Sequence, residues 1–267
     1  MERRPAPAWA RAYLTLTLIL AFLPAVVIVV GAVGTKLGWW SWKTGFVAVM
    51  VKGPMGLGWA PALASLAIVA ALVGLVISMG AGLWRRAFTA LVVGILTMGA
   101  FICIGGQAKK APPIHDVATD WSQPLMFSDT VMKDRGPDAN PVIPNPVATA
   151  GPLAGQKIAD VNARTCPGAK PVVLARAPAD AYATAKAALT KDGLKVVTDD
   201  PATGRLEAVA TSFWYGFKDD VVVRVKPQGG GSRIDLRSIS RVGLSDLGQN
   251  CKRITGLVAA MGGQASS

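Results

Sequence analysis

Residues 218–241 read KDDVVVRVKPQGGGSRIDLRSISR, and this pattern decides the fold. Apolar and polar side chains alternate on both sides of a glycine-rich segment. The alternation predicts two strands, 221–226 and 234–241, joined by a hairpin loop at 227–232. One face of these strands is apolar and is expected to be covered: it carries Val221, Val223, Val225, Ile234 and Leu236. The other face carries charges of both signs: Arg224, Lys226, Arg233, Asp235 and Arg237. Mixed charge favours a solvated face, and the alternative is a polar recognition surface for an anionic or protein ligand.

The chain from residue 171 onward predicts an α+β domain around these two strands. Further strands are expected at 172–174, 194–198 and 205–214, and helices at 179–191 and 246–260. Pro178 suits the first turn of the first helix and Gly193 follows its end. Ser245 is expected to cap the second helix. The resulting order, β-α-β-β-β-β-α, predicts an antiparallel sheet with helices on one face.

A proline-rich arm, residues 111–170, precedes this domain, which we place at 171–262. The arm contains nine prolines and little periodicity, so it predicts an extended segment with one short helix near 154–163. Sixty residues without structure would be unusual in a compact protein, and we expect part of the arm to wrap over the domain.

Residues 1–110 predict a membrane anchor of three helices. The runs 13–33, 59–84 and 87–106 are uncharged and long enough to cross a hydrocarbon core of about 30 Å. The first run is longer than the apolar part of a signal peptide, so an uncleaved anchor is favoured. A transporter usually needs an ionisable group within its spans, and its absence from these runs favours an anchor.

The net charge of +12 lies mostly in the anchor. Ten basic residues and one acidic residue precede residue 111, against 18 and 15 after it, which leaves +9 and +3. The excess therefore reflects charges that flank membrane segments, and no nucleic-acid partner is expected. Five Lys or Arg residues fall on each side of the predicted membrane, so the positive-inside rule does not orient the chain.

Three stretches together resemble the DUF1499 family, a family of unknown function. They are ATSFWYGFKDDVVVRV at 210–225, the glycine loop at 229–233, and DLRSISRVGLSDLG at 235–248, followed by Asn250 and Arg253. The segment PPIHD at 112–116 is similar to the one that opens the family's domain. The resemblance covers about 111–262 and implies that the arm belongs to the folded domain. It supplies no activity.

The resemblance also implies a location. Family members include membrane-anchored bacterial proteins and thylakoid-lumen proteins, which places the domain on the far side of an energy-transducing membrane. Cys166 and Cys251 depart from the family pattern, and their joint presence suits a disulfide between the arm and the terminal helix, in an oxidising compartment. We therefore predict a multi-pass protein of the bacterial inner membrane, with a cytoplasmic N-terminus and a periplasmic domain.

The sequence offers few candidate catalytic residues. His115 is the single histidine, and with Asp116 it could serve a nucleophilic mechanism, although a structural role where the arm docks is favoured. Asp219 and Asp220 could act as acid and base, but turn chemistry at a strand start also explains them. The spacing of histidines and cysteines predicts no metal site and no cofactor. The cluster Phe213-Trp214-Tyr215-Phe217 is either core or the wall of an apolar pocket.

Two hypotheses of function follow. The preferred one is a non-enzymatic accessory or binding module of the envelope, which contacts a membrane-protein partner or a lipid through its soluble domain. The alternative is a hydrolase-like envelope enzyme that uses His115, Asp116, Asp219 and Asp220. The predicted partner surface comprises His115, Asp116, Trp214, Tyr215, Lys218, Asp219, Asp220, Arg224, Arg237 and Arg241.

Overall fold

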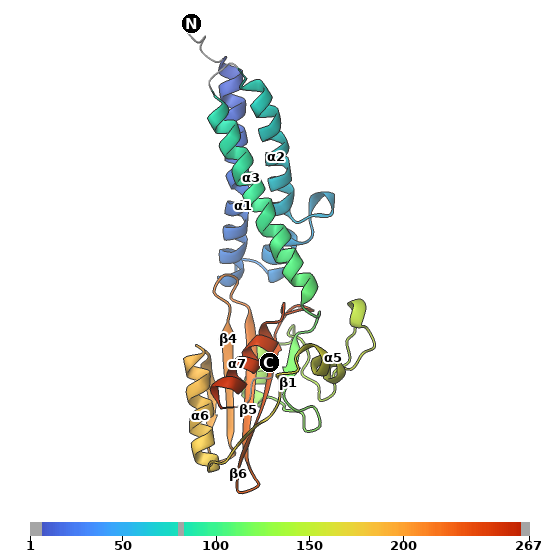
Figure 1. The fold of residues 1–267 in the computed structure, drawn as a ribbon, viewed down its shortest axis with the longest axis vertical. Coiled ribbons are helices and arrows are strands. Elements are labelled where there is room, and N and C mark those ends of the chain that lie inside the picture. Colours follow the sequence, from blue (N-terminus) through green and yellow to red (C-terminus); the bar gives the residue numbers. More distant parts are fainter. Residues whose placement is uncertain (1–6, 80–82, 263–267) are drawn as a thin grey trace. The chain divides into compact units, whose positions relative to one another are not determined.

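The computed structural model describes residues 7–79 and 83–262. By contacts between Cα atoms the chain divides into two units, which are described separately: Met1–Ala108 with Phe213–Gly216, and Lys109–Ser212 with Phe217–Ser267. Figure 1 shows the helices of the first unit and the sheet of the second.

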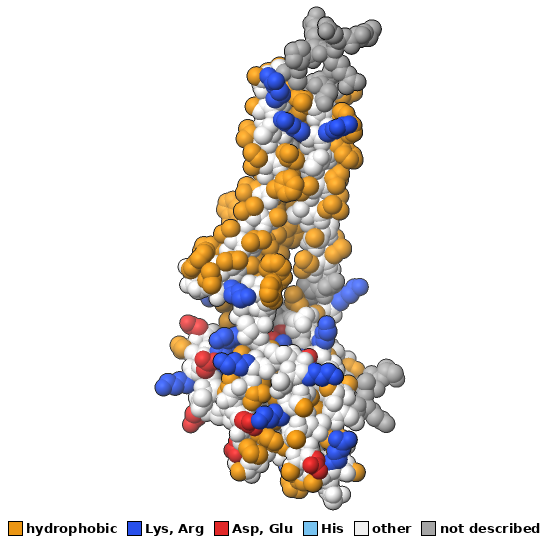
Figure 2. Space-filling view, turned by 90° about the vertical axis from the view of Figure 1, so that its left-hand side faces the viewer, with side chains coloured by type: hydrophobic (Ala, Val, Ile, Leu, Met, Phe, Trp, Pro, Cys, Tyr) orange, Lys and Arg blue, Asp and Glu red, His pale blue; other side chains and the backbone are white. Residues whose placement is uncertain are grey.

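The first unit contains three helices that are long and apolar enough to cross a membrane. They are α1 (Ala8–Lys36), α2 (Trp59–Ile77) and α3 (Trp84–Lys110). Two short segments lie between α1 and α2: the π-helix η1 (Lys43–Ala48) and the 3₁₀ helix η2 (Pro54–Gly56). Hydrophobic side chains cover the helices in Figure 2, as expected for surfaces that contact lipid. Small side chains let the helices approach closely, and Ala21, Ala67, Ala71 and Ala90 form a buried cluster.

The connection between α2 and α3 differs from the prediction. The run 59–84 predicts a helix that reaches residue 84 and the run 87–106 a helix that begins at residue 87, but α2 ends at Ile77 and α3 already begins at Trp84, with Arg85 and Arg86 in its first turn. Residues 80–82 of the predicted helix lie outside the described residues.

The second unit is built on an antiparallel sheet, which confirms the predicted α+β class. The strands follow the order β1-β6-β5-β4-β3, and β2 also pairs with β6. Their bounds are β1 (Asp116–Ala118), β2 (Val172–Leu174), β3 (Lys195–Asp200), β4 (Arg205–Thr211), β5 (Lys218–Gln228) and β6 (Gly231–Ser240). The remaining elements are α4 (Asp129–Arg135), η3 (Gly151–Leu153), α5 (Ile158–Thr165), α6 (Pro178–Lys191) and α7 (Gln249–Ala260).

One face of the sheet is aliphatic and lies under α6 and α7. The side chains predicted from the alternation, Val221, Val223, Val225, Ile234 and Leu236, are all buried in this core. They pack with Leu189 of α6 and with Ile254 and Leu257 of α7. Burial of such side chains is the main stabilising term, about 1.5–3 kcal/mol for each.

The opposite face is largely covered, and the expectation of a solvated face is wrong for Asp235 and Arg237 on it. A second apolar cluster lies here, in which Leu125, Phe127, Val131 and Val142 of the arm pack on Val222 and Ile239. The arm therefore covers this face, and Arg237 and Asp235 on it are fully buried. The arm also supplies β1 and α4, which the proline-rich composition did not predict.

Two turns also differ from their predictions. The β5–β6 hairpin closes through Gly229 and Gly230 alone, with φ of +57° and +78°, as expected for a two-residue turn between twisted strands. The terminal helix begins at Gln249 rather than after Ser245. Its free backbone donors are satisfied by Asp246, which accepts hydrogen bonds from the N–H groups of Gly248 and Asn250 at 2.8 Å.

Candidate functional site

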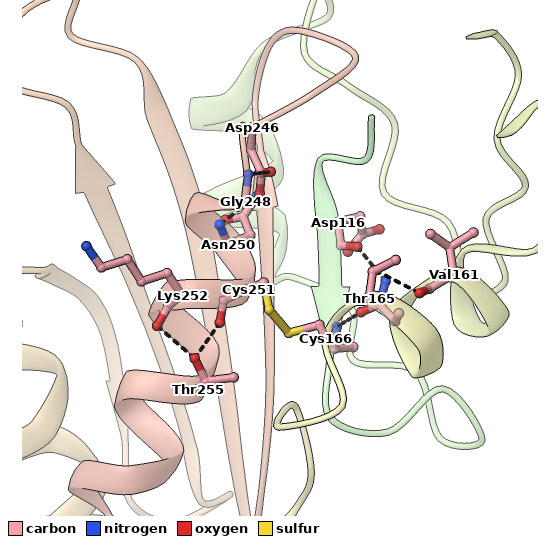
Figure 3. Close-up of a disulfide and its surroundings, with 12 residues drawn as sticks. Asp116, Val161, Thr165, Cys166, Asp246, Gly248, Asn250, Cys251, Lys252 and Thr255 are labelled. Atoms are coloured by element: carbon pink, nitrogen blue, oxygen red, sulfur yellow. Dashed lines mark hydrogen bonds between the residues drawn. A yellow bond between two sulfur atoms is a disulfide. The ribbon is translucent and has the colours of Figure 1, made fainter. Parts of the chain in front are cut away.

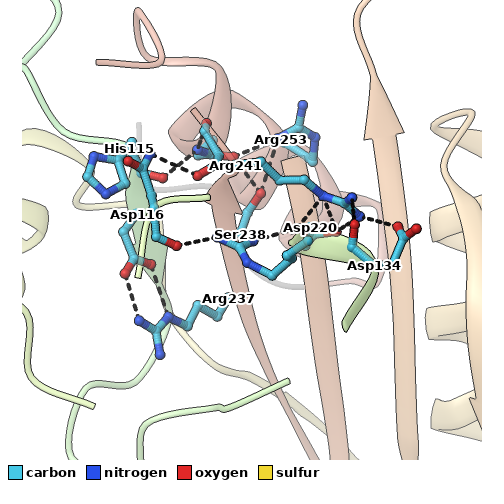
Figure 4. Close-up of polar contacts among 12 residues, drawn as sticks. His115, Asp116, Asp134, Asp220, Arg237, Ser238, Arg241 and Arg253 are labelled. Carbon is cyan, nitrogen blue, oxygen red and sulfur yellow. Dashed lines mark hydrogen bonds and ion pairs between the residues drawn. The ribbon is translucent and has the colours of Figure 1, made fainter. Parts of the chain in front are cut away.

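Arg237 on β6 is a fully buried cation, and its partners come from the arm (Figure 4). Its guanidinium forms a bidentate pair with Asp116 on β1, with N–O distances of 3.0 and 2.7 Å. It also donates to the carbonyl oxygens of Leu125 (2.7 Å) and Ile143 (2.9 Å). The ring of Trp121 lies 5.1 Å from the guanidinium carbon. Each of these side-chain contacts therefore holds the arm against the sheet.

Asp220 on β5 is a fully buried carboxylate that lies between two arginines. Arg135 of α4 approaches one oxygen at 2.5 Å, and Arg241 approaches the other at 2.7 Å. Arg241 also pairs with Asp134 at 2.7 Å, and Arg135 donates to the carbonyl oxygen of Asn140 at 2.7 Å. These bonds attach α4 to the sheet, and they occupy both oxygens of Asp220.

Glu207 on β4 is a third buried carboxylate on the same face. It accepts hydrogen bonds from the backbone and hydroxyl groups of Ser128, from the hydroxyl of Thr198 and from Arg205. Burial alone would raise the pKa of Glu207, but the bonds from Ser128 and Thr198 stabilise the charged form and hold the pKa below its ordinary value of 4.5. Glu207 is therefore an anion that holds the N-terminus of α4.

Asp235 on β6 lies between two arginines near the edge of this face. Arg224 approaches it at 2.8 Å and Arg233 at 2.7 Å, and Arg233 also pairs with Asp120 of the arm at 2.6 Å. The side chain of Arg224 is 27% exposed. A ligand could therefore reach Arg224, in contrast to the fully buried Arg237.

His115 lies where the chain enters the sheet. Its ring Nδ1 is 3.4 Å from the carbonyl oxygen of Leu244, and its own carbonyl accepts from the N–H of Ser240 and the side-chain amide of Asn250. The carboxylate of the neighbouring Asp116 forms an ion pair with Arg237. The described contact of the ring is therefore with a backbone carbonyl oxygen rather than with a nucleophile, which is the geometry of a docking contact of the arm.

The structure separates the predicted surface residues into two groups. Asp116, Asp220, Arg237 and Arg241 are buried and paired with one another, and Asp219 pairs with Arg253 at 2.8 Å. Trp214 is 61% exposed, Lys218 is exposed and Tyr215 is half-buried. The second group is therefore more exposed than the first.

Cys166 and Cys251 form a disulfide, with Cα atoms 5.8 Å apart (Figure 3). Cys166 directly follows α5 of the arm and Cys251 lies in the first turn of α7, so the bond joins the arm to the helical layer. A cavity of about 790 Å³ lies beside it, lined by both cysteines, Lys252, Arg253 and Thr255 among others. The third cysteine, Cys103, is exposed on α3.

Residues 7–79 and 83–262 contain no group of three His, Cys, Asp or Glu side chains that could hold a metal ion. Three residues that organise the buried face were not singled out from the sequence: Arg135, Glu207 and Ser128. Ser128 caps α4 through its hydroxyl, and the pair Ser128-Asp129 was the available signal for this seven-residue helix.

Comparison with known protein families gives a match that covers most of the second unit. A family model described as "Protein of unknown function (DUF1499)" matches residues 116–261, more than half of the chain. No curated protein matches the sequence.

Proposed function

Because the chain belongs to the DUF1499 family, for which no activity is described, we propose from its own residues that it is a membrane-anchored, non-enzymatic binding module of the cell envelope. One observation carries the proposal. The carboxylates that could act as acid or base are bound to guanidinium groups that attach the arm: Asp116 to Arg237, and Asp220 to Arg135 and Arg241. A general base must reach a substrate proton, and these side chains are almost fully buried.

These ion pairs also disfavour a hydrolase-like mechanism that uses His115, Asp116, Asp219 and Asp220. Such a mechanism would have to free Asp116 from a bidentate pair and Asp219 from Arg253. Release of either carboxylate leaves a buried or half-buried arginine without its partner, which is strongly unfavourable.

For the location we propose the bacterial inner membrane, with the N-terminus in the cytoplasm and the domain in the periplasm. Three helices long and apolar enough to cross a membrane support the anchor, and an odd number of crossings would put the two termini on opposite sides. The Cys166–Cys251 disulfide supports an oxidising compartment for the domain.

Site-specific photocrosslinking in native membranes tests the binding role. A photoreactive residue is introduced at Lys218, which is exposed at the start of β5, or at Lys252, which lines the 790 Å³ cavity. Lys191, exposed at the end of α6, is the matched control position. We expect adducts of discrete mass at 218 or 252 and none at 191, and mass spectrometry then identifies the partner protein or lipid.

The result that contradicts the proposal is the same weak adduct pattern at all three positions. The enzyme hypothesis makes a different prediction: His115→Ala would abolish a cellular phenotype while the disulfide and the adducts persist.

A further inference from the structure

The segment that follows α1 in the helical unit folds back against the end of that helix. It includes η1 (Lys43–Ala48), and two glycines bring the backbones together: a Cβ atom on Gly31 of α1 would lie 2.6 Å from the carbonyl oxygen of Gly45. The indole N–H of Trp40 also donates to the carbonyl oxygen of Gly31 at 3.2 Å. These contacts fix η1 against a helix that is long and apolar enough to cross a membrane.

Two apolar cavities lie next to each other along α1. The first, of about 370 Å³, lies between α1 and η1, and its wall includes Val26 and Val30 of the helix and Val49 after η1. The second, of about 340 Å³, is lined by α1 side chains between Leu18 and Val26. Because Val26 lines both cavities, we treat them as one groove that follows the helix from Leu18 to Gly31, and we call it the α1 groove.

The length and direction of the α1 groove suit one acyl chain of a lipid. From Leu18 to Gly31 the helix rises about 20 Å, at about 1.5 Å per residue. One leaflet contributes half of a hydrocarbon core of about 30 Å. A groove of this length along a membrane-spanning helix therefore extends through about one leaflet, as the chains of a phospholipid do. Its apolar wall excludes a ligand that needs polar contacts along its length.

The end of the α1 groove nearest to η1 carries groups that suit an anionic headgroup. Lys43 and Thr44 are exposed neighbours at the start of η1, and Thr44 also lines the groove. Trp39, in the turn after α1, is 66% exposed, as expected for an indole ring at a membrane interface. The sequence has no Asp or Glu between residues 7 and 110, so no carboxylate of the three helices and their connections would repel a phosphate. An exposed lysine beside an apolar groove at membrane depth is typical of sites for anionic lipids.

We infer that the α1 groove binds one acyl chain of an anionic phospholipid, whose phosphate lies against the ammonium group of Lys43 and the hydroxyl of Thr44. The inference goes beyond the proposed role of the soluble domain, because it concerns the helical anchor alone. It gives the anchor a specific lipid ligand in addition to the general contact of its apolar surface with the bilayer.

Native mass spectrometry of the full-length protein tests this site. The protein in detergent is incubated with equal amounts of phosphatidylglycerol and phosphatidylethanolamine that have the same acyl chains, and the detergent is then removed in the gas phase. The masses of the retained lipids give their number and their headgroup. We expect one phosphatidylglycerol molecule to be retained by each chain, and phosphatidylethanolamine to be retained several-fold less.

Two substitutions, each with a matched control, address the acyl chain and the headgroup separately. Val26→Trp fills the groove where the two cavities meet, and Val69→Trp places the same ring on α2, at a valine that is 58% exposed against 53% for Val26. Lys43→Gln removes the cation at the start of η1, and Arg85→Gln removes an exposed cation in the first turn of α3.

We expect Val26→Trp to lower the fraction of protein that carries phosphatidylglycerol several-fold, and Val69→Trp to leave that fraction unchanged. Lys43→Gln should remove the preference for phosphatidylglycerol over phosphatidylethanolamine, which Arg85→Gln should retain. If Val26→Trp does not elute as a single species in detergent, Val30→Trp on the same wall of the groove replaces it.

Three results would overturn the inference. The first is lipid retention by the groove variant equal to that of the wild type, and the second is equal retention of both lipids by the wild type. The third is a dimer in place of a lipid-bound monomer, which would indicate that a second copy of the chain covers the groove. The photocrosslinking adducts at residues 218 and 252 do not depend on these results, so the two proposals fail separately.

Discussion

Leu236 and Arg237 are neighbours on β6 that lie on opposite faces of the sheet, and neither is exposed to solvent. Leu236 packs in the aliphatic core under α6 and α7. Arg237 lies under the arm, where Asp116 and two carbonyl oxygens satisfy it. The two faces are thus buried to a similar degree, one by aliphatic packing and the other by an ion pair and hydrogen bonds.

The difference has a consequence for how each face tolerates change. An aliphatic contact loses energy gradually as methylene groups are removed, and neighbouring side chains can partly relax. An ion pair excluded from water is satisfied only when both partners are present, since one charge left alone pays its full desolvation cost. The face of the sheet that the arm covers, here called the arm face, should therefore lose more stability on a single substitution than the aliphatic face. Its ion pairs also specify where the arm docks.

The largest effect is expected from Arg237→Ala. The change leaves Asp116 without its cation and the carbonyl oxygens of Leu125 and Ile143 without a donor, so the free energy of unfolding of the domain should fall by about 3–5 kcal/mol. Hydrogen exchange of peptides from β5 and β6, measured on the full-length protein in detergent, reports this energy. Leu236→Ala is the matched control on the other face and should cost about 3 kcal/mol.

A double variant distinguishes the two faces more sharply. Asp116→Leu combined with Arg237→Met removes both charges and should restore a large part of the loss, because a buried ion pair can be replaced by apolar side chains of similar volume. A double variant as unstable as Arg237→Ala alone would contradict the view that the unpaired charge causes the defect.

The disulfide joins the two layers, and its removal should have the next largest effect. Cys251→Ser opens a loop of 85 residues between the arm and α7, which by loop entropy destabilises the domain by about 4.5 kcal/mol at most. In a Cys103→Ser background, a maleimide that shifts gel mobility should label no cysteine in intact cells before reduction and two after it. Labelling before reduction would contradict both the bond and the proposed oxidising compartment.

The aliphatic face could be read from the sequence, and the arm face could not. Alternation at residues 221–225 and 234–236 is local, so it identifies the side chains under the helices directly. Arg237 shows the same alternation, but its partner Asp116 lies 121 residues away, and nothing in either segment indicates their pairing. The predicted partner surface includes the buried residues Asp116, Asp220 and Arg237 for the same reason, since charged side chains on a strand look solvated until the segment that covers them is known.

The pH dependence of stability tests a smaller part of the arm face. The pKa of Glu207 lies below its ordinary value of 4.5 in the folded domain, so Glu207 stabilises the fold above about pH 4.5 and this contribution is lost as the pH falls through the folded pKa. Glu207→Gln should destabilise the neutral protein by about 1–3 kcal/mol, the usual worth of hydrogen bonds to a charged group. The gap between variant and wild type should narrow below pH 4.5 in hydrogen exchange. A gap independent of pH would assign the effect to packing instead.

The smallest effect on stability is expected where an ion pair is exposed. This case shows whether the sensitivity of the arm face to substitution comes from the burial of its ion pairs or from their charge. Lys186 and Asp199 form a pair on the helical side, but their side chains are 48% and 41% exposed. Water replaces a lost partner at such a site, so Lys186→Ala should leave the unfolding midpoint of the domain unchanged, in contrast to Arg237→Ala. Urea unfolding of both variants in the same detergent makes the comparison. If Lys186→Ala destabilised the domain as much as Arg237→Ala, burial of the ion pairs beneath the arm would not explain the difference between the two faces. The loss of a charge pair alone would then be the cause.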